Sequence, residues 1–260
     1  MKREMSVVGT FYPREAKEIL RYFDSFSTSF DKEFSLIEAK TRAVIVPHAG
    51  YVFSGYSANI AYRVLAKSGI KNFVVIGPSH RVAFEGVSIS ASSEYLTPFG
   101  PLAKSELIHD AIQKDFGLSE KITHAEHSTE VQFPFIKHYI SDAKIVELVY
   151  GSAYASSLSK IIDMVLNLED CGVIISTDLS HFYNQDIANK LDSICLEAIK
   201  KLDISLLHQG CEACGILGVE AMMLSAQKQK LSPIILDYRT SSDASGDDSS
   251  VVGYMSACFV

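Results

Sequence analysis

Residues 43–58, AVIVPHAGYVFSGYSA, decide how the rest of the chain is interpreted. They predict a buried strand over 43–46, which a proline ends, followed by His48 and a loop rich in glycine and aromatic side chains. The pattern recurs at 73–80, FVVIGPSH, where a second apolar strand is followed by His80. Histidines directly after two strands are typical of a site at the carboxyl edge of a parallel sheet. His48 and His80 are therefore candidates for one shared site.

Outward from this stretch, apolar strands and amphipathic helices alternate along the chain. Strands are expected over 41–46, 72–76, 86–91, 144–149, 173–176, 233–238 and 251–259, and helices over 14–26, 56–67, 105–116, 128–140, 156–168, 186–200 and 215–230. The unit from 41 to 76 favours parallel pairing of its two strands through a right-handed crossover. No repeat or long linker divides the sequence, so residues 1–260 are expected to form one α/β domain with a mixed, mostly parallel sheet flanked by helices.

Composition excludes several classes of function. The 260 residues carry a net charge of −7 and no basic run, which argues against a nucleic-acid partner. No apolar segment approaches the roughly 18 residues of a membrane span, and no signal peptide is recognisable, so we expect a cytoplasmic protein with no membrane partner. The 5 cysteines are odd in number and widely spread, which favours reduced thiols over a disulfide framework.

Side chains able to bind a metal follow four of the expected strands: His48, His80, the pair Asp178 and His181, and the acidic group Asp237, Asp243, Asp247 and Asp248. Two imidazoles and one carboxylate with open positions are the ligands of non-haem iron(II) oxygen chemistry. A zinc hydrolase can use the same ligands. A histidine in a loop, taken alone, is usually a surface or hydrogen-bonded residue. The repeated strand-end context favours a shared site.

The segment 124–134, HAEHSTEVQFP, holds a second group of polar residues. His127 and Glu130 are three residues apart and can share one helical face, where they would contribute to a substrate pocket. The acidic residues fit a helix start equally well, because they would complement the helix dipole.

Cys211 and Cys214 form a single CxxC pair. A structural zinc would need two further ligands at matching spacing, and a thioredoxin-type site would need its own surrounding fold. The simplest interpretation is two partly buried thiols near a helix start. Cys214 is the more interesting of the two, because it directly precedes an expected helix, where a thiolate is stabilised.

Seven motifs along the chain are familiar: VPHAGYVFSG (46–55), GPSH (77–80), TPFG (97–100), EHSTEVQFPF (126–135), STDLSH (176–181), CGILGVEA (214–221) and DSSVVGY (248–254). In this order they resemble the Memo family, whose prokaryotic members are also called AmmeMemoRadiSam system protein B. The resemblance implies a fold similar to that of the class III extradiol dioxygenases, which hold iron(II) with two histidines and a carboxylate. It also implies companion proteins, one of the AMMECR1 type and one a radical-SAM enzyme.

The resemblance assigns roles to individual residues. It implies that His48 and His80 bind the metal, and that His181, preceded by Asp178, corresponds to an acid–base residue of the dioxygenases. Animal members of the family carry a cysteine shortly before the DSS motif. In this chain Asp243 stands at that position, so a carboxylate ligand of the dioxygenase type is expected there.

Together these observations predict a dioxygenase-like redox enzyme of unknown substrate. Iron(II) is the expected metal, with copper or zinc as alternatives. The expected substrate pocket contains five residues: Tyr51, Phe53, His127, Glu130 and Cys214. Two other functions fit the same residues, a non-catalytic module that recognises a peptide or a partner protein, and a metal-dependent hydrolase.

Overall fold

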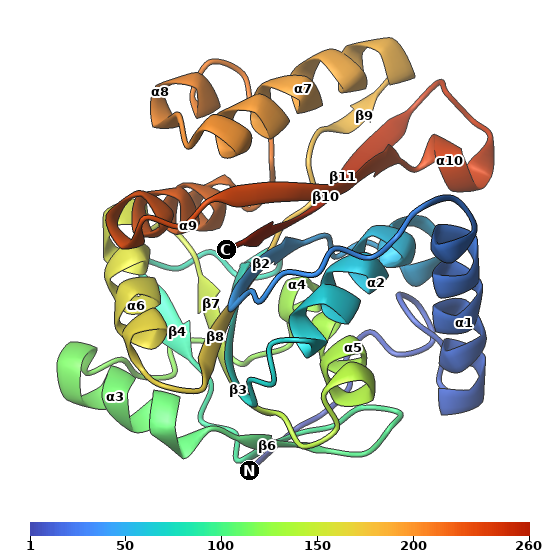
Figure 1. The fold of residues 1–260 in the computed structure, drawn as a ribbon. Helices are drawn as coiled ribbons and strands as arrows, with labels where there is room; N and C mark the ends of the chain where they lie inside the picture. The colour runs from blue at the N-terminus through green and yellow to red at the C-terminus, as the bar shows by residue number, and fades with distance from the viewer.

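The computed structural model describes every residue from 1 to 260 and contains one mixed sheet with helices on both faces (Figure 1). The strands are β1 (Lys2–Arg3), β2 (Ala43–Val46), β3 (Asn72–Pro78), β4 (Val87–Ile89), β5 (Glu94–Tyr95), β6 (Leu102–Lys104), β7 (Lys144–Tyr150), β8 (Cys171–Ser176), β9 (His181–Tyr183), β10 (Pro233–Thr240) and β11 (Val251–Phe259). The helices are α1 (Ala16–Glu33), α2 (Tyr51–Ala66), α3 (Glu106–Phe116), α4 (His127–Glu130), α5 (Gln132–Tyr139), α6 (Ala155–Asn167), α7 (Gln185–Lys201), α8 (Ile204–Leu207), α9 (Ile216–Gln229) and α10 (Ser242–Ser245). No helix combines the length and the apolarity that crossing a membrane requires.

The centre of the sheet is parallel, in the order β6-β7-β3-β8-β2, and β11 and β10 extend it with antiparallel pairing. The expected direct pairing of the strands over 41–46 and 72–76 is wrong. β8 lies between β2 and β3, so that Ile174 is opposite both Val44 and Val75. The loops that follow β2 and β3 consequently lie on either side of the carboxyl end of β8.

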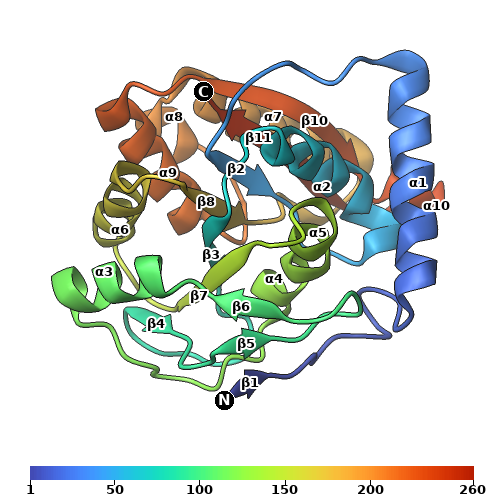
Figure 2. The ribbon, with the colours of Figure 1, turned by 60° about the horizontal axis from the view of Figure 1, so that its bottom comes forward.

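Alternate side chains of the parallel strands enter two separate cores. In β2, Ala43 and Ile45 pack with α3, α6, α7 and α9, whereas Val44 and Val46 pack with α1, α2 and α5. Figure 2 shows α3, α6 and α9 on one side of the sheet and α1, α2 and α5 on the other. Full burial of one such aliphatic side chain contributes about 1.5–3 kcal/mol. The continuously apolar central strands are therefore explained by burial on both faces.

Two helices differ from the sequence expectation. α2 begins at Tyr51, directly after the histidine loop, and the Tyr51 amide donates to the Phe11 carbonyl at 2.8 Å. Tyr51 and Phe53 thus belong to a helix and not to a loop. The helix expected over 128–140 is divided at Val131 into α4 and α5. Pro134 lies in the first turn of α5, where a missing amide proton breaks no helical hydrogen bond.

A buried ion network attaches the amino-terminal arm to the sheet. The Arg3 guanidinium lies 2.7 Å from Glu130 Oε2 and 3.6 Å from Glu147 Oε2. Glu130 also accepts hydrogen bonds from the Val7 amide at 2.8 Å and the Tyr12 hydroxyl at 2.9 Å. All three charged side chains are at most 4% exposed. Glu130 therefore holds the arm in place.

The expectation that all cysteines are reduced is wrong. Cys195 of α7 and Cys211 form a disulfide, while Cys171, Cys214 and Cys258 remain free. The bridge connects α7 to the segment that leads into α9. Two buried sulfurs were brought together by tertiary packing, which cysteine spacing alone does not reveal.

Replacing Cys195 and Cys211 by alanine is expected to lower the free energy of unfolding by about 2–4 kcal/mol, because a bridge that closes a loop of this length restricts the unfolded chain. Urea denaturation followed by circular dichroism measures the change. Reductant should shift the wild-type midpoint towards that of the double variant and leave the variant unchanged. A wild-type midpoint that is insensitive to reductant would contradict the bridge.

Candidate metal centre

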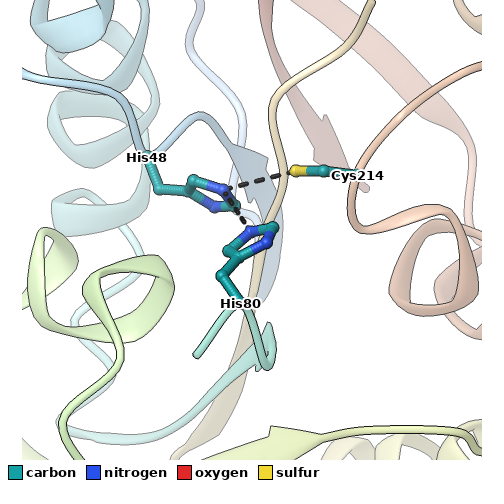
Figure 3. A group of neighbouring side chains, drawn as sticks. All are labelled: His48, His80 and Cys214. Atoms are coloured by element: carbon teal, nitrogen blue, oxygen red, sulfur yellow. Dashed lines mark hydrogen bonds between the residues drawn. The ribbon is translucent and has the colours of Figure 1, made fainter. Parts of the chain in front are cut away.

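Three side chains from distant parts of the chain converge at the carboxyl end of the parallel strands. His48 follows β2, His80 follows β3 and Cys214 precedes α9. His48 Nε2 lies 3.3 Å from His80 Nε2 and 3.3 Å from Cys214 Sγ (Figure 3). The potential ligand atoms of all three residues lie within 4.8 Å of one another. Sequence analysis expected the two histidines to meet, whereas the thiol was expected only in a neighbouring pocket.

The hydrogen bonds of Ser176 determine which nitrogen of His48 faces this group. Ser176 Oγ donates its single proton to the Ser128 carbonyl and accepts from Gln132 Nε2 at 2.9 Å. His48 Nδ1 lies 2.9 Å from the same oxygen, which has only an acceptor position left. Nδ1 therefore carries the proton, and the lone pair of Nε2 points towards His80 and Cys214. A fixed tautomer of this kind is the usual preparation of a metal-binding histidine.

A third imidazole covers the pair. His127 of α4 stacks on His80, with ring centroids 4.9 Å apart and an interplanar angle of 22°, and meets His48 edge-on at 5.3 Å. Burial lowers the pKa of His48 well below its usual value, and it also lowers the pKa of His80. Burial, followed by the nearby His48 and His80, lowers the pKa of His127 to about 3. The three rings are therefore neutral at pH 7, which is the form that binds metals.

Asp178 is buried beneath His48 and holds its backbone. Its Oδ1 accepts a hydrogen bond from the His48 amide at 2.7 Å, and its Oδ2 lies 3.9 Å from His48 Nε2. Burial raises the pKa of Asp178 to about 6. The carboxylate makes no hydrogen bond to His181, which is half-buried in β9 opposite Val252. After burial, His80 and then His181 contribute to the lowered pKa of His48.

The Cys214 thiol is held by the segment that follows β8. Its sulfur accepts from the Asp178 amide at 3.3 Å, and its own amide donates to the Asp178 carbonyl at 3.2 Å. Burial, followed by the charge of Asp178, raises the pKa of Cys214 to about 12. The thiol is therefore protonated in the absence of a cation, and a bound metal would displace that proton.

Asp243, the carboxylate expected beside the histidines, is elsewhere in the structure. It is exposed in the first turn of α10, where its Oδ2 accepts from the Thr240 amide at 2.8 Å. Its oxygens are not part of the group formed by His48, His80 and Cys214. The short helix turns the carboxylate back onto its own backbone, and a thiol stands next to the histidines instead.

The remaining residues of the expected pocket separate into different environments. Tyr51 is 1% exposed and donates its hydroxyl proton to the Val131 carbonyl at 2.9 Å. With Phe53, it lines a cavity of about 660 Å³ beside Phe11, whose ring lies 4.7 Å from that of His127. Glu130 does not line this cavity, because its carboxylate binds Arg3 in the amino-terminal arm. His127 and Cys214 are the expected pocket residues that meet the histidine pair directly.

Sequence analysis missed Ser176 and Gln132 as supporting residues. Both lie in motifs that were noticed, STDLSH and EHSTEVQFPF. The sequence feature that could have identified Ser176 is its hydroxyl at the last position of an apolar strand, close to a loop that carries a histidine. Its partner could not be identified, because the position of β8 between β2 and β3 was unknown.

Comparisons with known proteins agree with the resemblance. A family model described as Memo-like protein matches residues 3–258. A MEMO1 family protein from Methanobrevibacter smithii is 36% identical over 282 residues, covering 100% of both chains. Another from Aquifex aeolicus is 31% identical over 274 residues, covering 99% of both chains.

One solved structure has a similar fold. The crystal structure of an uncharacterized protein from Escherichia coli K12 matches with a TM-score of 0.56 and 13% sequence identity, covering 84% of this chain and 99% of that chain. At this identity the match concerns the fold alone. The family model and the relatives extend over essentially the whole sequence. The chain therefore belongs to the Memo family.

Proposed function

We propose that the protein binds one divalent transition metal between His48 Nε2, His80 Nε2 and Cys214 Sγ and acts as a metal-dependent redox enzyme. The observation that carries this proposal is the spacing of 3.3 Å between His48 Nε2 and each of the other two atoms. Nitrogen and sulfur atoms bonded to one tetrahedral ion lie about 3.3–3.6 Å apart, given bonds of about 2.0–2.3 Å. Two of the three distances between the potential ligand atoms thus match a single tetrahedral ion, and the third is at most 4.8 Å.

Iron(II) is the metal that we propose for an oxygen-dependent reaction. Bound by three protein atoms, it would supply one-electron chemistry and leave coordination positions open for dioxygen and substrate. The neutral imidazoles of His48 and His80 would donate to the ion, and the Cys214 thiolate would offset part of its charge. Asp178 keeps the His48 backbone in place through the bond to its amide.

The other residues around the site handle protons and solvent. His181, half-buried in β9, is the candidate for moving a proton to or from a bound substrate. His127 stacks on His80 and also contacts the Phe11 ring, whereas His80 itself remains exposed and accessible to a substrate. Tyr51 and Phe53 line the adjoining cavity, whose volume of about 660 Å³ suits a small molecule or a short peptide segment.

A zinc-dependent hydrolase is the second candidate, and the Cys214 thiol is the observation that favours it. Cysteine and histidine together are common zinc ligands, with a fourth position left for water in catalytic sites. The two candidates differ in their need for oxygen, because a zinc hydrolase works equally well without it.

Untagged protein prepared without oxygen and loaded with either metal distinguishes these proposals. We expect one equivalent of iron(II) per chain and an electron paramagnetic resonance signal when nitric oxide, a stand-in for dioxygen, binds the open position. Tight zinc binding with no nitric oxide signal from the iron form would favour the hydrolase. Failure to bind either metal would overturn both.

A further inference from the structure

Glu126 lies immediately before α4 and contacts the loop that carries His80. Its Oε1 accepts a hydrogen bond from the Arg81 amide at 2.8 Å and lies 2.9 Å from Ser79 Oγ. These are the residues on either side of His80. The Glu126 side chain is buried, with 1% of the residue exposed. A single carboxylate oxygen of Glu126 is thus bonded to the residue before His80 and to the residue after it.

The segment that begins α4 contacts this loop at several further points. Ser128 Oγ donates to the Pro78 carbonyl at 2.7 Å, where β3 ends. The His127 ring stacks on His80. The approach is so close that a Cβ atom at Gly77 would lie 2.8 Å from Ser128 Oγ. Residues 126–128 therefore hold the loop at its start, at the His80 ring and at its far side.

The second oxygen of the Glu126 carboxylate has no hydrogen-bond partner although it is buried. A buried charged oxygen without a partner is costly unless a positive charge lies nearby. Because the other oxygen is bonded to both neighbours of His80, the carboxylate lies beside the residue that would bind a cation.

We propose that Glu126 is a positioning residue that presents His80 to the metal. This inference rests on the proposed function, because it requires that His80 binds an ion. The Arg81 amide donates to no other acceptor, so removal of the carboxylate frees the loop after β3. His80 Nε2 would then no longer be held 3.3 Å from His48 Nε2.

Three substitutions separate positioning from charge. Glu126→Ala removes both, Glu126→Asp keeps the charge but shortens the reach by one methylene, and Glu126→Gln keeps an acceptor oxygen at the same reach without the charge. Affinity for cobalt(II) is measured by competition with a chelator, and the cobalt absorption bands report the coordination. Glu130→Gln is the matched control, since Glu130 is equally buried in the same segment but binds the amino-terminal arm.

We expect Glu126→Ala and Glu126→Asp to bind cobalt(II) about 10–100-fold more weakly, as is usual when a residue supporting a ligand is lost. Glu126→Gln should recover most of the affinity and the wild-type absorption bands. Glu130→Gln should lower the unfolding temperature while leaving the affinity unchanged.

Wild-type affinity in Glu126→Ala, or an equally weak Glu126→Gln, would overturn the positioning role. If Glu126→Ala does not fold, the contrast between the Asp and Gln variants still decides the question. Absence of cobalt binding by the wild type would instead overturn the metal site itself, so the two failures are distinguishable.

Discussion

Replacing both His48 and His80 by alanine is expected to abolish stoichiometric metal binding. Loss of a supporting residue alone typically lowers metal affinity about 10–100-fold, so loss of two ligands should exceed about 100-fold. The physical reason is that only Cys214 of the three proposed ligands would be left, with a thiol whose pKa is raised to about 12 by burial. Metal content of untagged protein, determined by mass spectrometry after dialysis against a fixed free metal concentration, measures the loss.

His208→Ala is the control for this experiment. His208 pairs with Glu220 at 3.0 Å, and its side chain is 54% exposed and outside the cluster. We expect this variant to hold as much metal as the wild type. Equal metal content in the double variant and the wild type would contradict a site at His48 and His80.

Replacing Arg3 by alanine is expected to lower the free energy of unfolding by about 3–5 kcal/mol at neutral pH, as is typical when one partner of a buried ion pair is removed. Burial raises the pKa of Glu147, but Arg3, His124 and Thr129 together hold it below its usual value. Without Arg3, the carboxylates of Glu130 and Glu147 lose their closest cation. Urea denaturation measures the change.

The destabilisation should depend on pH in a defined direction. A carboxylate whose pKa is lowered in the folded protein contributes stability above its unfolded pKa and loses it as the pH falls through the folded value. The difference between wild type and Arg3→Ala should therefore be largest at neutral pH and shrink below about pH 4.

Lys2→Ala provides the neighbouring control for Arg3→Ala. Lys2 pairs with Glu94 at 3.3 Å, but both side chains are largely exposed, and such pairs contribute about 0–1 kcal/mol. Similar losses for the two variants would show that Arg3 does not hold a buried network.

The fold was predictable where local patterns are unambiguous. Alternating apolar strands and amphipathic helices identified the α/β class, and two strand ends followed by histidines pointed to the candidate site. The order of the strands was not predictable, because nothing local in β2 or β3 states that β8 is inserted between them. The start of α2 was missed because Gly50 before it and Gly55 within it make the segment resemble a loop, whereas a hydrogen bond from the Tyr51 amide to the Phe11 carbonyl holds the helix start in place.

The composition of the candidate site was only partly predictable. His48 and His80 share a repeated sequence context, so their association could be expected. Cys214 joins them because Gly215 donates to Thr177 Oγ1 at 2.8 Å, which attaches the start of α9 to the end of β8. The two residues of that contact are far apart in the sequence, so no local pattern predicts it. Asp243 was chosen by its place in a motif, and position in a motif does not establish where a side chain points.

The most direct test of the account is a crystal structure of the protein soaked with iron(II) under anaerobic conditions, with anomalous data collected at the iron edge. We predict one ion, bonded at about 2.0–2.3 Å to His48 Nε2, His80 Nε2 and Cys214 Sγ. An ion held by the two histidines and Asp243, with Cys214 outside bonding distance, would contradict the assignment of the thiol. Absence of any ion at the histidines would contradict the metal centre altogether.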